Sequence, residues 1–159
     1  TSMTPSGPAH SGVAEILHDL RALYGEALFA RKGIAFELRT SPNLPAAAIP
    51  PDALKQVFLN LFINAIQAMG QGGKLVVDAA IQNSRIAVTV SDTGQGMASD
   101  VLQSIFTPYY TTKPAGTGLG LAIVLKILEE HDCEIKVNSV PGQGTTFTLL
   151  FPKTTAVQG

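Results

Sequence analysis

The chain has 159 residues, of which 45% are hydrophobic and 14% are charged, with a formal net charge of −1. This length suits one domain with a sizeable core, and the absence of a basic stripe excludes a typical nucleic-acid-binding protein. The single Cys133 excludes an internal disulfide and a cysteine metal cluster. Because no apolar run approaches the roughly 18 residues of a membrane span, we expect a cytoplasmic domain.

Loose tails are predicted at 1–10, where the first residues resemble a cloning remnant before a start codon, and at 152–159. Residues 11–151 are predicted to form one domain. Its first segment, 11–31, has apolar residues at helical spacing from Val13 onward. This spacing predicts an amphipathic lead-in helix.

The next elements follow from alternation and turn signals. Apolar residues alternate from Ile34 to Leu38, which predicts a half-buried strand. A proline-rich loop precedes a hydrophobic helix, for which Asp52 is a plausible N-cap and the sequence "GQGG" at 70–73 the end. Two further strands, 74–82 and 85–92, are joined by the hairpin residues Asn83 and Ser84.

The last third of the chain combines a long loop with one helix and one hairpin. Residues 93–118 are rich in Gly, Thr and Pro, and a connection of this length is usually functional. A helix is predicted from about Leu119 to Glu130, and strands "EIKVNS" and "GTTFTLLF" follow as a hairpin. The order of elements indicates an α+β sandwich, with one sheet and its helices on one face.

The hydrophobic helix contains an unusual polar face. Its sequence "QVFLNLFINAIQAM" places Asn60 and Asn64 one turn apart, with no charged residue between Lys55 and Lys74. Uncharged amides suit a pocket for a polar ligand or metal-bound water, whereas solvated helix faces usually carry Glu, Lys or Arg. On this pattern alone, a mildly polar solvated face or amides that cap a nearby loop remain alternatives.

Two glycine-rich segments are candidate ligand loops. Asp92 ends a predicted strand and is followed by Gly94 and Gly96, so its carboxylate is placed to accept a hydrogen bond from an exocyclic amine, although a plain turn has the same pattern. Glycines 116, 118 and 120 directly precede a helix, which is typical of an anion site. Neither a Walker A loop nor a dinucleotide fingerprint fits their spacing.

Together these segments resemble the ATP-binding catalytic domain of sensor histidine kinases, a superfamily shared with gyrase B, Hsp90 and MutL. The resemblance covers about 34–151: "NLFINAIQAM" resembles the N-box, "DTGQGM" the G1 box, "IFTPYYTTK" the F-box, "GTGLGLAI" the G2 box, and "SVPGQGTTFTLLFP" the last hairpin. It implies a Bergerat-type fold, a two-layer α/β sandwich. Its sheet would be mixed, mostly antiparallel and five-stranded, with about three helices on one face.

The resemblance also implies cofactors and site residues. The cofactors are ATP and Mg²⁺, with Asn64 as metal ligand and Asn60 on the phosphate side as the second catalytic position. Asp92 would bind adenine N6, with Gly94 and Gly96 making room for the base. The remaining nucleotide contacts are expected from the lid anchor Phe106, from Lys113, for which a solvated lysine is the alternative, and from the G2 residues Gly116, Thr117, Gly118, Leu119 and Gly120.

One residue distinguishes the branches of this superfamily. ATPase members carry a glutamate one turn before the metal-binding asparagine, and here that position is Asn60, which cannot act as a general base. The resemblance therefore implies a protein-histidine kinase rather than a hydrolase. An anti-sigma-factor-type serine kinase and a nucleotide-binding regulatory domain without catalysis are the alternatives.

The expected partners are a separate, dimeric phosphoacceptor domain of the same kinase and a response regulator receiver domain. The fragment itself is expected to be monomeric, and membrane anchoring of the full-length protein stays open. The segment "HDLRAL" looks superficially like the box that carries the phosphorylated histidine, but it lacks that box's proline. We therefore interpret His18 as a surface residue of an amphipathic helix. Asp132-Cys133 stand where the family often has two glycines, away from the expected pocket.

Overall fold

The computed structural model describes residues 10–105 and 120–154. In chain order its elements are α1 (Val13–Tyr24), the π-helical turn η1 (Gly25–Phe29), the 3-10 turn η2 (Ala30–Lys32), β1 (Ile34–Thr40), α2 (Pro51–Met69), β2 (Gly73–Gln82), β3 (Arg85–Asp92), α3 (Ser99–Leu102), α4 (Gly120–Glu130), β4 (Glu134–Val140) and β5 (Gly144–Pro152).

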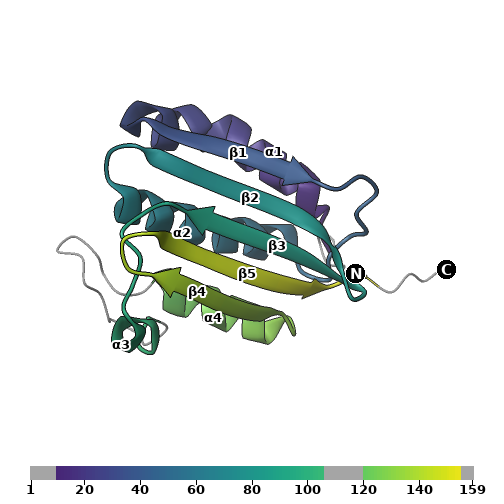
Figure 1. Ribbon diagram of the computed structural model, residues 1–159. Coiled ribbons are helices and arrows are strands. Elements are labelled where there is room, and N and C mark those ends of the chain that lie inside the picture. Colours follow the sequence, from purple (N-terminus) through teal and green to yellow (C-terminus); the bar gives the residue numbers. More distant parts are fainter. Residues whose placement is uncertain (1–9, 106–119, 155–159) are drawn as a thin grey trace.

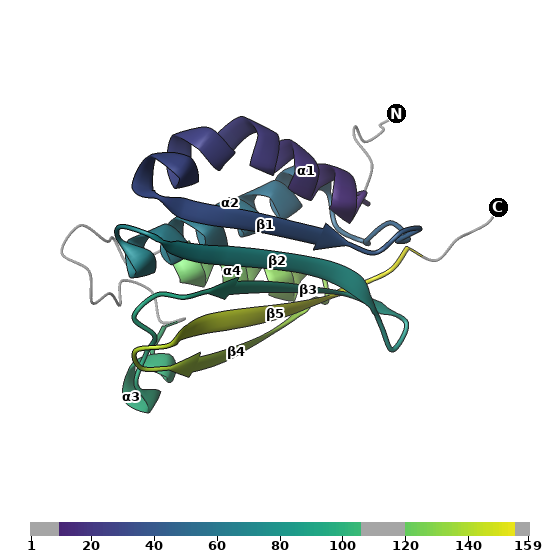
Figure 2. The same cartoon turned by 45° about the horizontal axis from the view of Figure 1, so that its top comes forward.

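The five strands form one mixed sheet in the order β1-β2-β3-β5-β4. β1 and β2 are parallel, and the other three pairs are antiparallel. α1, α2 and α4 cover one face of this sheet (Figures 1 and 2). The predicted two-layer α+β sandwich is therefore confirmed.

Helix α2 forms the centre of the helical layer because its apolar residues recur every three or four positions. Its buried residues are Leu54, Val57, Phe58, Leu61, Phe62, Ala65 and Ile66. The helix ends at Gly70, as predicted, but the predicted N-cap is wrong. The cap is Pro50 and Pro51 occupies the first turn, where a missing N–H costs nothing, so Asp52 lies inside the helix.

Helix α1 is part of the domain core. Its buried residues Val13, Ile16, Leu17 and Leu20 belong to the same hydrophobic cluster as α2. The aromatic ring of Phe29 lies 4.9 Å from that of Phe36 on β1 and 5.9 Å from that of Phe62 on α2, both edge-to-face. These rings join the end of the first helical segment to the sheet and to α2.

Local turn chemistry sets the two hairpins. Asn83 and Ser84 both have positive φ, at 50° and 65°, which matches the two-residue turn predicted between β2 and β3. The second hairpin turns at residues 141–143, also as predicted. The predicted tail begins too early, however, because β5 includes Pro152 and Thr154 N–H donates to the Ala46 carbonyl at 2.8 Å.

Candidate functional site

Three of the predicted segments meet at one end of the sheet. β3 ends at Asp92, which pairs with Thr145 at the start of β5, and the β4–β5 turn lies at the same end. In Figure 1 the last turn of α2 and the end of β3 lie together at the left of the molecule. Helix α4 begins at this end too, because β4 follows it closely and runs back toward it. The topology thus brings the N-box, the G1 box and the start of α4 together.

Asp92 is a buried carboxylate, only 7% exposed. Its Oδ1 accepts hydrogen bonds from Gly94 N–H at 2.8 Å and from Thr145 N–H at 3.3 Å. The two donors come from opposite sides, one from the loop after β3 and the other from strand β5. Because backbone amides favour the ionised carboxylate and fix its orientation, Asp92 is a positioned acceptor rather than an ordinary turn residue.

The polar face of α2 does not behave as one stripe. Gln56 and Gln67 are exposed to solvent, whereas Asn60 and Asn64 are half-buried. The Nδ2 atom of Asn60 is buried without a hydrogen-bond partner among the described residues. Leaving such a donor unsatisfied costs about 1–3 kcal/mol, so an amide held in this way is a candidate contact for a ligand. These observations favour the pocket over a solvated helix face.

The glycines of the loop after β3 allow close backbone contacts. A Cβ on Gly94 would lie 2.8 Å from the carbonyl of Ala68, near the end of α2, and Gln95 N–H donates to that carbonyl at 3.2 Å. Gly96 has a φ of 70°, and a Cβ there would lie 2.0 Å from the Val140 carbonyl oxygen. Side chains at either position would push the loop away from its neighbours, so Gly94 lets the loop lie against the end of α2 and Gly96 lets it lie against the end of β4.

Several predicted contacts lie outside the described residues, so their roles stay predictions. They are Phe106, Lys113, Gly116, Thr117, Gly118 and Leu119. Gly120 is described as the first residue of α4, and a Cβ there would meet none of the described atoms within 4 Å. The predicted helix at about 119–130 is confirmed from this glycine onward.

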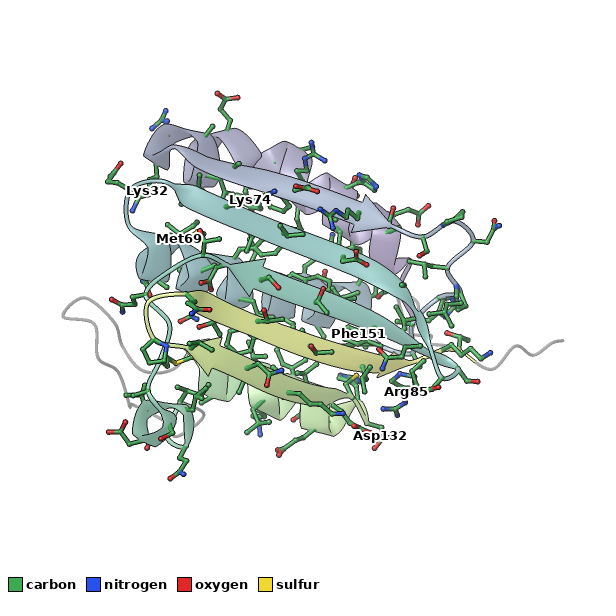
Figure 3. All side chains as sticks on the ribbon, viewed as in Figure 1. Lys32, Met69, Lys74, Arg85, Asp132 and Phe151 are labelled. Carbon is green, nitrogen blue, oxygen red and sulfur yellow. The ribbon has the colours of Figure 1, made fainter. Side chains whose placement is uncertain are left out.

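Sequence reasoning missed three hydroxyl groups around the site. Thr93 Oγ1 accepts a hydrogen bond from Lys74 N–H at 3.0 Å and lies 3.8 Å from the sulfur of Met69; Figure 3 labels Met69 and Lys74 at this end. Thr145 is 3% exposed, and Ser139 Oγ accepts from Met97 N–H at 2.8 Å. The sequence signal available for Ser139 and Thr145 was the glycine-rich turn "PGQG" between them, and that turn predicted only a hairpin.

The departure from the family pattern at 131–133 lies at the opposite end of the sheet. Figure 3 labels Asp132 and Arg85 far from Met69. Asp132 adopts a left-handed φ of 59°, which aspartate tolerates better than most residues, and Arg85 Nη2 donates to its carbonyl at 3.3 Å. Burial raises the pKa of the Cys133 thiol to about 12. The thiol is therefore protonated and unreactive at neutral pH, as expected for a small buried side chain.

The described residues contain no group of three or more His, Cys, Asp or Glu side chains able to hold a metal ion. A magnesium ion held mainly by phosphate oxygens needs few protein ligands, and one amide oxygen is a suitable one. Asn64, half-buried on α2 one turn after Asn60, fits this requirement.

A family model described as "Histidine kinase-, DNA gyrase B-, and HSP90-like ATPase" matches residues 50–155. The chain belongs to this family. Its N-box and G1 box, together with the last hairpin, lie within the matched region.

The curated relatives are kinases of greater length. The sensor histidine kinase ZraS of Escherichia coli (strain K12) is 50% identical over 118 residues, which are 73% of this chain and 25% of that protein. Sporulation kinase C of Bacillus subtilis (strain 168) is 46% identical over 99 residues, 62% of this chain and 23% of that protein. The chain thus spans about a quarter of the length of these relatives.

Solved structures agree with the fold. The catalytic domain of histidine kinase ThkA has a TM-score of 0.81 at 30% identity, covering 91% of this chain and 94% of that chain. Full-length ShkA in complex with AMPPNP has a TM-score of 0.83 at 28% identity, covering 99% of this chain and 34% of that one. Within residues 10–105 and 120–154, no helix has the length and apolar character needed to cross a membrane.

Proposed function

We propose that this domain binds ATP with Mg²⁺ and transfers the γ-phosphoryl group to a histidine on a separate domain of the same kinase. A response regulator aspartate would then receive the phosphoryl group. The observation that carries the proposal is the positioned Asp92 carboxylate in contact, through the loop that follows it, with α2, the helix that also carries the buried Asn60 amide. The amine of an adenine ring needs an acceptor such as the Asp92 carboxylate, and a phosphate chain needs a donor such as the Asn60 amide.

Each residue then has a defined role. Asp92 accepts a hydrogen bond from the adenine N6 amine and so selects the base. Asn60 Nδ2 would donate a hydrogen bond on the phosphate side of the nucleotide, and the Asn64 amide oxygen would hold Mg²⁺. The bound cation would neutralise charge on the phosphates, so the protein's contribution is positioning. Phe106 and Lys113 would act from the lid, and the backbone amides of the G2 glycines would bind phosphate oxygens.

Transfer is favoured over hydrolysis because α2 itself carries no carboxylate one turn before Asn64. The only acidic residue of α2 is Asp52, two turns before Asn60. At 1.5 Å of rise per residue this is roughly 12 Å along the helix axis, too far to take a proton from an attacking water.

The relatives support this assignment. ZraS and the sporulation kinase are named as kinases, ShkA was solved with AMPPNP, and ThkA has been solved in complex with the response regulator TrrA, where its likeness to this chain has a TM-score of 0.76. We extend the nucleotide and the response regulator to this protein on that basis.

Phosphotransfer from γ-labelled ATP to a supplied helical-hairpin domain carrying the acceptor histidine tests the proposal. We expect acid-labile phosphate on that histidine, and its loss when the histidine is replaced by alanine. Phosphoserine would instead support the serine-kinase alternative. Nucleotide binding without transfer to any acceptor would support the regulatory one.

Asn60→Glu is expected to raise acceptor-independent ATP hydrolysis at least about tenfold, because a carboxylate at this position can take a proton from water. Release of inorganic phosphate measures the effect. Asn60→Gln, which has the same length without the carboxylate, is the matched control and should hydrolyse no faster than the parent. If Asn60→Glu binds Mg-ATP but releases no additional phosphate, Asn60 does not occupy the water-activating position.

A further inference from the structure

The loop after β3 is locked to the β4–β5 turn by direct backbone contact. A Cβ on Gly96 would lie 2.0 Å from the Val140 carbonyl oxygen, and one on Gly144 would lie 2.0 Å from the Asp92 carbonyl oxygen. Gly142 N–H also donates to the Gln95 carbonyl at 2.6 Å. The position of the loop that carries Asp92 therefore depends on a hairpin distant in sequence.

Ser139, near the end of edge strand β4, joins the two segments through one hydroxyl group. Its Oγ accepts from Met97 N–H at 2.8 Å, donates to the Gly144 carbonyl at 3.1 Å and lies 2.7 Å from Thr145 Oγ1. A hydroxyl has one proton to donate and two lone pairs to accept with. When the Ser139 hydroxyl donates its proton to the Gly144 carbonyl, its oxygen accepts hydrogen bonds from Met97 N–H and Thr145 Oγ1–H. The hydrogen-bonding capacity of this hydroxyl is then fully used.

These bonds connect two segments that flank the proposed base-binding carboxylate in sequence or in the sheet. Thr145, which contacts the Ser139 hydroxyl, also donates its N–H to Asp92 Oδ1. Met97, the other partner, lies at the far end of the loop that begins with Asp92. Ser139 thus bonds to β5, which donates to the Asp92 carboxylate, and to the loop that follows Asp92.

We propose that Ser139 is a positioning residue for adenine recognition, which it serves by holding the Asp92 loop against the β4–β5 turn. The inference rests on the proposed nucleotide function and extends it to a side chain that is not among the residues proposed to contact the nucleotide. Without the hydroxyl, Met97 N–H loses its partner and the loop gains freedom to move away from β5. The orientation of the Asp92 carboxylate toward the base is then weakened, whereas the three partners of the Ser139 hydroxyl lie in β5 and in the loop before α3 rather than on α2.

The test compares two nucleotides that differ only at the group Asp92 would bind. Mg-ATP and the Mg complex of purine riboside triphosphate, which lacks the 6-amino group, are titrated by calorimetry against the parent, Ser139→Ala and Ser139→Thr. Ser91→Ala is the matched control, because Ser91 Oγ makes a comparable 2.8 Å bond to Thr146 Oγ1 between β3 and β5 without reaching the loop.

We expect Ser139→Ala to weaken ATP binding about five- to tenfold, the effect of one misplaced hydrogen bond, and to weaken the analogue less than twofold. Ser139→Thr, which retains the hydroxyl on a residue suited to strands, should restore ATP affinity, and Ser91→Ala should bind both ligands like the parent. Equal losses for the two nucleotides, or ATP affinity unchanged in Ser139→Ala, would overturn the positioning role. Failure of the parent itself to bind ATP would instead overturn the proposed function.

Discussion

Asn64→Ala is expected to reduce both Mg-ATP affinity and phosphotransfer by about 100-fold or more, because it removes the side-chain oxygen proposed to hold the cation. Asn64 is half-buried on α2, one turn after Asn60, so alanine fits the helix without strain. Alanine is also the better helix former, and the fold should keep its stability. Calorimetric titration with Mg-ATP and the phosphotransfer assay measure the two losses.

The control for this variant is Gln56→Ala on the same helix. Gln56 is exposed, and its replacement removes an amide of similar chemistry two turns before Asn64. It should bind and transfer like the parent. Raising the Mg²⁺ concentration should partly rescue Asn64→Ala, since a weakened metal site fills at higher concentration. Parent-like binding and transfer by Asn64→Ala would show that the metal site lies elsewhere.

Gly144→Ala is expected to destabilise the domain by at least about 4 kcal/mol and to weaken ATP binding at least about tenfold. The residue has a φ of 128°, and a Cβ would lie 2.0 Å from the carbonyl oxygen of Asp92. Because the contacted atom is backbone, relief requires moving the end of β3 away from β5. The same movement displaces the Asp92 carboxylate.

Gly142→Ala in the same turn separates backbone strain from the close approach. Gly142 also has positive φ, at 80°, but a Cβ there would meet no atom within 4 Å. We expect it to cost about 1 to 2 kcal/mol, the penalty for an L-residue in left-handed backbone. Urea unfolding gives both values, and equal losses in the two variants would contradict the importance of the Gly144–Asp92 contact.

Local patterns predicted the elements well where the governing signal is itself local. The strand at 85–92 has the predicted bounds. It begins directly after Asn83 and Ser84, two turn residues that both adopt positive φ. The start of α2 was misplaced by two residues. There, Asp52 is a good cap by side-chain chemistry, but Pro51 suits the first turn and extends the helix past it.

The sequence names candidate site residues, but it does not predict how they are arranged. Asn60, Asn64 and Asp92 come from two boxes that the sequence alone identifies. That Asn60 buries its amide nitrogen while Gln67 stays exposed depends on what packs over each position of α2. Helical periodicity predicts which residues share a face of the helix, but it does not predict which of them neighbouring elements cover.

The sequence by itself determined the types of the elements and their order, because helical period, strand alternation and turn residues act over a few positions. Only the tertiary structure decided how Asp92 is held. Its Thr145 donor lies 53 residues away, and the Ser139–Met97 bond spans 42. These pairs meet because β5 lies between β3 and β4, a strand order set by burial of the whole sheet against α1, α2 and α4.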